Sequence, residues 1–362
     1  MFRITWRAML LATSFIACSP VALADTPTSG FITAAGRKDV AYDTAHGVLY
    51  ISGDSTLRRF DMKTGTFLAP IALGGVTAGL DISPDGKTLA VANLSRGATK
   101  NFVDLVSLDS LSHQRVGFDR AFGEGGTFTA AFDKSGKLLV SSEYEGSGWV
   151  PLRKYDISTG STAVLASVRQ DSMLSPSADH SFIAITESNI SSGPYGLYKA
   201  GDTSYASKRD LGWFTFEIGV SRDGSQIAVP TYNGTYIDDK TNILPSIGTY
   251  AGTLPIGVAY SPVADVMYLP FAGTNYIASY DTKTGTQIQK FNTPGNFGWV
   301  GNWAFNEGRT KVASDGSLLF STLDNGVFYQ QLTTAVPEPT TAWLAGAGLA
   351  FFALRRRTTQ TA

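Results

Sequence analysis

Cysteine is nearly absent from this chain of 362 residues, which contains a single copy, Cys18. That residue lies in a segment, residues 1–24, with the order typical of a secretory signal peptide: a basic start, an apolar core, and small residues at Ala22 and Ala24 before Asp25. Removal of this segment would leave the mature protein without a thiol. Disulfides and cysteine chemistry are then excluded, and stability must come from core packing.

Cys18 allows a second interpretation of the N-terminus. The run Phe15-Ile16-Ala17-Cys18 is similar to a degenerate lipoprotein box, in which the cysteine would carry a lipid. Phe15 fits such a box poorly, and a lipid would duplicate the membrane attachment expected at the other end of the chain. We therefore favour cleavage after Ala24, with lipidation of Cys18 as the alternative.

Charged side chains are also few, at 16% of the chain, and nearly balanced in sign. Without the terminal segments the body carries a net charge of about −5 and retains no basic stripe, which argues against nucleic acid as a partner. Aromatic residues reach 12%, and glycine is abundant. This balance is typical of strands joined by tight turns, and residues 25–335 are long enough for one large β-domain.

A repeated phrase organises residues 25–335. Its clearest copy runs from Gly79 to Asn93 and contains a strand, the turn Ser83-Pro84-Asp85-Gly86, and a second strand. Similar turns recur every 40 to 50 residues. We mark them at Asp43, Ser83, Asp133, Ser175, Ser221, Ser261 and Asn306, the last in competition with a turn at residues 311–316. Seven units of four short strands predict a seven-bladed β-propeller, because a ring buries faces that a single blade would expose.

The third strands carry a second signature, an aromatic-Asp pair followed by Thr-Gly, at Phe60-Asp61, Tyr155-Asp156 and Tyr280-Asp281. Together with the Ser-Pro-Asp-Gly-Lys phrase, this pattern resembles the YVTN-type repeat of WD40-like and quinoprotein amine dehydrogenase-like propellers. The resemblance implies an all-β fold of four-stranded antiparallel blades over residues 25–335, with a β-sandwich as the alternative. We expect the strand at residues 31–34 to close the ring as the outer strand of the seventh blade.

The C-terminal segment, residues 336–357, has three parts. Val336-Pro337-Glu338-Pro339 precedes a run of 15 apolar and small residues, 340–354, which ends at Arg355-Arg356-Arg357. As a helix this run would span roughly 22 Å, which is shorter than a bilayer core of ~30 Å. The arginines favour the cytoplasmic side, so residues 358–362 would be a short cytoplasmic tail and the body would lie outside.

This three-part segment resembles the PEP-CTERM sorting signal of Gram-negative bacteria, which the membrane enzyme exosortase cuts. The resemblance implies export by the general secretory route, with signal peptidase and exosortase as processing partners. The body would be anchored transiently at the inner membrane, in the periplasm, and would then reach the cell surface or the extracellular matrix. An ordinary tail anchor is the alternative.

Ligands of propellers usually bind at the central channel, near the loops that enter the first strand or leave the second strand of each blade. Carboxylates, amides and aromatic rings are expected in those loops, at Asp54, Asn93, Glu143, Glu187, Tyr232, Trp213 and Trp299. Such groups suit a hard cation such as Ca²⁺, or sugar rings stacked on the aromatics. Acidic residues also solvate loop ends and tryptophans also fill gaps between blades, and we favour this structural interpretation, with no cofactor required.

Histidine occurs three times, at His46, His113 and His180. Two of these take the same place in the first and fourth turns, on different sides of the predicted ring, and His113 lies in a hairpin turn. Three histidines placed in this way cannot share a metal. The chain also lacks a Gly-x-Ser-x-Gly nucleophile turn and a phosphate-binding P-loop.

Two functions of different class remain. The first is a non-catalytic binding module, displayed at the cell surface or in an exopolysaccharide matrix and engaged with a polysaccharide or a surface protein; the resemblance of the tail to sorting signals linked with exopolysaccharide and biofilm favours it. The second is a metal-assisted hydrolase of the lactonase kind, a function of some similar propellers, with a channel metal held by Glu143 and Glu187.

Overall fold

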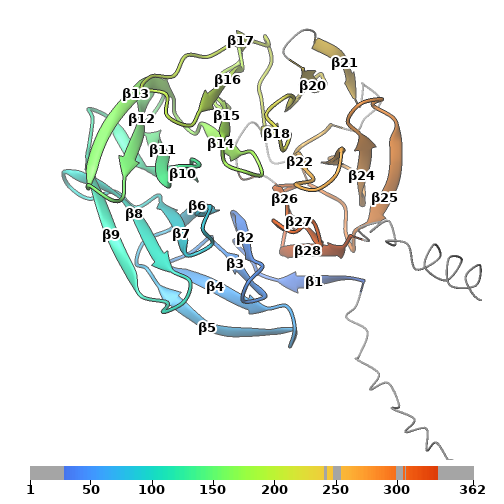
Figure 1. The fold of residues 1–362 in the computed structure, drawn as a ribbon, viewed down its shortest axis with the longest axis horizontal. Coiled ribbons are helices and arrows are strands. Elements are labelled where there is room, and N and C mark those ends of the chain that lie inside the picture. The colour runs from blue at the N-terminus through green and yellow to red at the C-terminus, as the bar shows by residue number, and fades with distance from the viewer. Residues whose placement is uncertain (1–27, 240–242, 248–253, 299–304, 306, 333–362) are drawn as a thin grey trace, which may run out of the picture.

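The computed structural model describes residues 28–239, 243–247, 254–298, 305 and 307–332, and every helix or strand assigned within them is a β-strand. The strands form seven four-stranded antiparallel sheets arranged as a ring (Figure 1). This confirms the predicted seven-bladed propeller. The expected signal peptide and the segment from Val336 onward lie outside the described residues. Within the described ranges, no helix long and apolar enough to span a membrane is found.

Each blade consists of four strands that follow one another in sequence from the channel outward, except the seventh. Blades 1 to 3 are β2 (Val40–Asp43), β3 (Val48–Ile51), β4 (Thr56–Asp61) and β5 (Thr66–Ala72); β6 (Thr77–Ile82), β7 (Thr88–Asn93), β8 (Lys100–Ser107) and β9 (His113–Asp119); and β10 (Glu124–Phe132), β11 (Lys137–Tyr144), β12 (Trp149–Asp156) and β13 (Ser161–Arg169).

Blades 4 to 6 repeat this order. They are β14 (Met173–Pro176), β15 (Phe182–Thr186), β16 (Pro194–Lys199) and β17 (Arg209–Asp210); β18 (Gly219–Val220), β19 (Ile227–Thr231), β20 (Gly234–Asp238) and β21 (Ile243–Ile247); and β22 (Ala259–Tyr260), β23 (Val266–Pro270), β24 (Tyr276–Asp281) and β25 (Gln287–Asn292). Blade 7 is β26 (Thr310–Val312), β27 (Leu318–Leu323), β28 (Gly326–Gln331) and, outermost, β1 (Ser29–Thr33).

The two ends of the domain meet in blade 7, where β1 lies beside β28 (Figure 1). The strands pair antiparallel with Phe31 opposite Phe328 and Thr33 opposite Gly326. Ile32, between them, is buried in the cluster that joins blades 7 and 1. The predicted closure of the ring by the N-terminal strand is therefore confirmed, and the C-terminal tail leaves the blade that holds the N-terminal strand.

The repeated turn is held by its own side chains. In blade 2, Ser83 Oγ accepts the N–H of Thr88 at 2.9 Å and donates to Asp85 Oδ1 at 2.6 Å. Ser221 repeats both bonds in blade 5. Because serine and aspartate bond locally and the glycine adopts positive φ, this phrase is a stable turn wherever it occurs.

The seventh turn is an exception to the marked positions. It covers residues 313–317, where the N–H of Gly316 donates to the carbonyl of Ala313 at 2.8 Å and Gly316 has φ of 75°. The competing turn at residues 311–316 is thus the right one, and the marker at Asn306, which lies outside the described residues, is wrong. The glycine after Asp315 supplies the backbone conformation that the turn requires.

The core lies between the blades. The cluster between blades 2 and 3 contains Ala90, Val103, Phe132 and Leu138, all fully buried. Burial of a phenylalanine or leucine side chain contributes about 1.5–3 kcal/mol. Tyr155, one of the third-strand aromatics, belongs to the same cluster, so its ring packs between the two blades.

Candidate functional site

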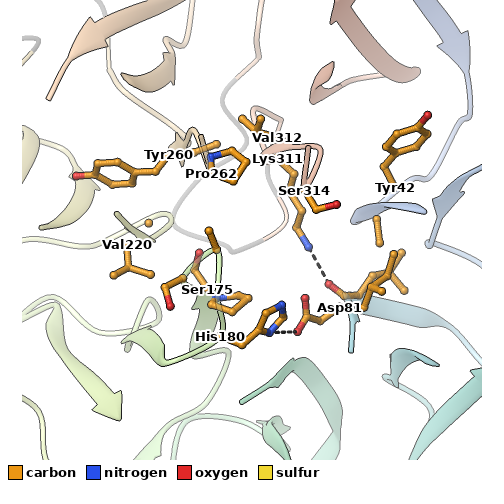
Figure 2. Close-up of a pocket in the computed structure, with 18 of the residues that line it drawn as sticks. Tyr42, Asp81, Ser175, His180, Val220, Tyr260, Pro262, Lys311, Val312 and Ser314 are labelled. Atoms are coloured by element: carbon orange, nitrogen blue, oxygen red, sulfur yellow. Dashed lines mark hydrogen bonds and ion pairs between the residues drawn. The ribbon is translucent and has the colours of Figure 1, made fainter. Parts of the chain in front are cut away.

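A cavity of about 670 Å³ occupies the centre of the ring. All seven innermost strands contribute to its wall, as do the turns that connect first and second strands (Figure 2). Tyr42 of blade 1 and Tyr260 of blade 6 lie on opposite sides of it (Figure 2). The cavity is therefore at the end of the channel where the first strand of each blade turns into the second.

An ionic cluster lies at the deep end of this cavity, formed by Asp39, Glu217, Arg309 and Lys311. Arg309 donates from Nε to Asp39 Oδ1 at 2.9 Å and from a second nitrogen to Glu217 Oε2. Lys311 Nζ lies 3.3 Å from Asp39 Oδ2 and donates to the carbonyl of Leu80 at 2.7 Å. The arrangement connects blade 7 with blade 1 and with the strand that opens blade 5.

Burial and ion pairing act in opposite directions on the two buried carboxylates. Burial opposes ionisation of Asp39, but Arg309 and Lys311 outweigh it and hold the pKa of Asp39 below its usual range. Burial raises the pKa of Glu217, although Arg309 opposes the shift. Asp39 also accepts the backbone N–H groups of Val40 and Leu80 at 2.8 and 2.9 Å, which stabilises its charged form.

Asp81 and His180 form a second polar group on the cavity wall (Figure 2). Nδ1 of His180 lies 2.9 Å from the carbonyl oxygen of Phe132 and 3.9 Å from Asp81 Oδ2. Since a carbonyl only accepts, Nδ1 carries the proton and donates it. Within the described part of the chain, Nε2 of His180 has no hydrogen-bond partner. Burial raises the pKa of Asp81, although His180 and Lys311 oppose the shift.

Phe305 packs against Arg309 from outside the cavity lining. The guanidinium carbon lies 5.6 Å from the centre of the Phe305 ring, and Phe128 contacts the same ring at a centroid distance of 4.7 Å. Arg309 is thus stacked on an aromatic ring as well as paired with two carboxylates. Its guanidinium group stabilises the fold and is not available to a ligand. Lys311, His180 and Asp81 are among the polar residues of the lining that can contact a small polar ligand in the cavity.

The residues predicted from the sequence lie at other positions. Asp54 is paired with Arg58 and accepts the N–H of Thr56, and Asn93 is buried with its amide nitrogen 2.9 Å from the carbonyl of Gly74. Neither lines the cavity. Asp54 follows β3 and Asn93 is the last residue of β7, so both lie at the end of the ring opposite the repeated turns.

Glu143 and Glu187 are both partly withdrawn from water. Burial and the nearby Asp171 raise the pKa of Glu143 to about 7, with Lys38 opposing the shift. Burial raises the pKa of Glu187, which accepts the N–H of Arg169 at 2.7 Å. Among the residues that the structure describes, no three histidine, cysteine or carboxylate side chains are grouped closely enough to hold a metal ion.

The aromatic candidates divide into three cases. Tyr232 contacts the rings of Phe214 and Phe216 at centroid distances of 6.2 and 5.0 Å. Trp213 is 40% exposed, in the connection between β17 and β18. Trp299 lies outside the described residues.

The position of His180 at the cavity could not be predicted from the sequence. The sequence pattern excluded only a metal shared by the three histidines, and it placed His180 at the same turn position as His46. In the structure His46 bonds Asp43 at 2.7 Å and is not part of the cavity lining, whereas His180 lines the cavity. No sequence signal separates the two residues, since each lies in the turn after an innermost strand.

Comparisons with known proteins agree with the predicted sorting motif and with the propeller fold. Residues 335–357 match the PEP-CTERM protein-sorting motif. The motif implies export and processing at the membrane by exosortase in a Gram-negative bacterium. No curated protein sequence is significantly similar to the chain.

Solved structures show the same fold. The β-propeller domain of Cps50 (Swd1) from Myceliophteria thermophila is 13% identical with a TM-score of 0.60, and the match covers 84% of this chain and 100% of that one. A chain of Kuenenia stuttgartiensis hydrazine synthase is 14% identical with a TM-score of 0.64, covering 88% and 99%. A chain of the mitotic checkpoint complex is 11% identical with a TM-score of 0.64, covering 91% and 99%. At these identities the likeness concerns the fold alone, that of a β-propeller.

Proposed function

We propose that this protein is an exported, non-catalytic binding module, which works at the cell surface or in the exopolysaccharide matrix. The observation that carries the proposal is the match of residues 335–357 to a sorting motif, directly after a complete propeller. A PEP-CTERM-sorted propeller fits an exported interaction module, because propellers present loops from many blades on one rigid ring. Its partner is a matrix polysaccharide or another surface protein.

Processing begins with signal peptidase at Ala24 and ends with exosortase at the motif Val336-Pro337-Glu338-Pro339. Between the two steps the apolar run and the arginines at 355–357 anchor the body transiently at the inner membrane. Since β1 and β28 are paired in blade 7, both cleaved ends leave the same blade. Removal of the tail then leaves the ring closed.

The sorting step is tested by replacing Pro337, Glu338 and Pro339 with alanine in the producing cell. The full-length variant should stay in the inner-membrane fraction, while a control with Thr340 and Thr341 replaced by alanine should reach the outside as the wild type does. Unchanged arrival of the first variant at the surface would disprove exosortase sorting. Intact C-terminal arginines on extracellular wild-type protein would disprove it as well.

A metal-assisted lactonase remains the second candidate, and one observation favours it. A carboxyl group with pKa near 7, as in Glu143, suits general acid–base chemistry at neutral pH. A cation such as Ca²⁺ would have to be held by Glu143 or Glu187 together with backbone or amide oxygens, since the described residues contain no group of three histidine, cysteine or carboxylate side chains fit for a metal. Stoichiometric Ca²⁺ or Zn²⁺ in the purified protein together with lactone opening, both lost in Glu143→Gln or Glu187→Gln, would replace the binding-module proposal.

A further inference from the structure

The two most exposed aromatic side chains of the described residues are on blade 3 and its entry loop. Phe122 is 95% exposed, between β9 and β10, and Trp149 is 55% exposed, at the first residue of β12. Both positions are at the end of the ring opposite the repeated turns, since β10 and β12 both begin there. The N–H of Glu145 donates to the carbonyl of Gly123 at 2.7 Å, which joins the two loops.

The ring of Tyr144 lies between the two backbone segments that carry Phe122 and Trp149. It packs against Gly123 and Gly148, the neighbours of these two residues in the chain, so closely that a Cβ there would lie 2.4 and 2.7 Å from its atoms. Only glycine allows this approach, and Gly123 also has φ of 70°. Tyr144 thus holds the two segments side by side, and we call Phe122, Tyr144 and Trp149 the blade 3 aromatic cluster.

Trp149 is held in place from one side. Arg169 is its cross-strand partner in β13, and the guanidinium carbon lies 4.9 Å from the centre of the Trp149 ring. Arg169 is itself buried, and donates to the carbonyl of Asn189 at 2.8 Å and to Ser147 Oγ at 2.5 Å. The indole is thus supported by a fixed cation while more than half of it stays open to solvent.

The loop before Trp149 is fixed in a similar way. The amide of Gln170 accepts the N–H of Gly148 at 2.7 Å and donates to the carbonyl of Gly146 at 3.1 Å. A ligand that covers the indole therefore meets a surface that is already ordered, and little conformational entropy is lost on binding.

Charged groups border the cluster. Glu145 pairs with both Arg96 and Arg120, and its side chain and that of Arg96 are 38% and 50% exposed. A ring with one open face beside carboxylate and guanidinium groups matches the chemistry of a sugar, whose C–H face stacks on the ring while its hydroxyls bond to the polar groups. A protein partner would also contact exposed aromatic and arginine side chains, so the experiment below includes a protein partner as a separate outcome.

We propose that the blade 3 aromatic cluster binds polysaccharide by stacking sugar rings on Trp149 and Phe122, with Glu145 and Arg96 contacting sugar hydroxyls. The proposal rests on the proposed function and names its ligand class and its site. The site is distinct from the central cavity, whose lining contains none of these residues.

Affinity electrophoresis of the protein recovered from producing cells tests the site. The gels contain hydroxyethylcellulose, dextran, alginate or the matrix polysaccharide of the same cells. At least one polymer should retard the wild type, and Trp149→Ala and Phe122→Ala should each weaken retention by about five- to tenfold. Trp149→Phe, which keeps a ring, should restore most of it, so that a folding defect is recognised.

A matched control makes the test specific. Phe67→Ala removes an aromatic ring that is 48% exposed on the outer strand of blade 1, and this variant should bind within about twofold of the wild type. Trp213 is an indole 40% exposed in another loop, so Trp213→Ala tests a competing site. Loss of retention in Trp213→Ala alone would place the sugar elsewhere and overturn the cluster, while the proposed function would stand.

Three further outcomes complete the test. If retention is the same in all variants, the cluster is not the polysaccharide site, although the protein remains a polysaccharide-binding module. If no polymer retards the wild type but polysaccharide-stripped cells capture it through Trp149, the partner is a surface protein and the sugar proposal is overturned. If wild-type protein associates with neither polymers nor cells, the proposed function itself fails.

Discussion

Replacing Arg309 with methionine removes the cation at the centre of the ionic cluster. Arg309 is 6% exposed and its two partners, Asp39 and Glu217, are almost inaccessible. Methionine has a similar length but no charge, so Glu217 loses its ion pair while Asp39 keeps only Lys311. Loss of one partner from a buried ion pair costs about 3–5 kcal/mol, because a charge stays buried without compensation.

The corresponding change in melting temperature follows from the size of the domain. An unfolding entropy of ~2.1 cal/mol/K per residue gives about 0.65 kcal/mol/K for the 311 residues of 25–335, so Arg309→Met should lower Tm by about 5–8 °C. Differential scanning calorimetry at pH 7 measures this shift. Arg222→Met is the control, since Arg222 is 41% exposed and pairs with Asp265 at the surface, where such pairs contribute less than about 1 kcal/mol. Equal shifts in the two variants would refute the reasoning that burial makes the cluster costly to break.

Ring closure and the buried acid give two further predictions. Ile32→Ala should destabilise the domain by about 2–4 kcal/mol in chemical denaturation because Ile32 is buried between blades, whereas Phe31→Ala, at a side chain 40% exposed, should cost less than ~1 kcal/mol; equal costs would contradict closure by β1. Burial and Asp171 raise the pKa of Glu143 from 4.5 to about 7, so wild-type stability should fall as pH rises through this window. Glu143→Gln removes that loss and should be more stable than wild type by up to ~2 kcal/mol at pH 8 but not at pH 4, in melting curves across this range; a gain independent of pH would contradict the shift.

Most of the fold could be predicted from patterns of contiguous residues. The turn Ser83-Pro84-Asp85-Gly86 is recognisable because its bonds are made within the phrase itself, and the same holds for Asp281, whose Oδ1 accepts the N–H groups of Lys283 and Thr284 at 2.9 and 2.8 Å. In blade 7 the phrase is weaker, and the marker at Asn306 fell in the wrong place. The competing turn was visible because Asp315-Gly316 keeps the essential pair.

The candidate site was much harder to predict, because its members are brought together only by the ring. Asp39 and Arg309 are 270 positions apart, yet their side chains are bonded at 2.9 Å. No spacing rule covers such a pair. The histidine pattern also gave no reason to place His180 at a cavity. The choice between the two ends of the channel likewise required knowing which side chains line the cavity.

By itself, the amino-acid sequence determined the sorting motif and the propeller architecture of this protein. The sorting motif and the repeated turn are read from contiguous residues, so their meaning does not depend on what lies across the fold. The tertiary structure alone decided which charges meet in the channel, that His180 faces a cavity, and that Phe122 and Trp149 flank a single tyrosine. Those facts depend on the curvature and closure of seven blades, which bring distant residues together and which no local pattern specifies.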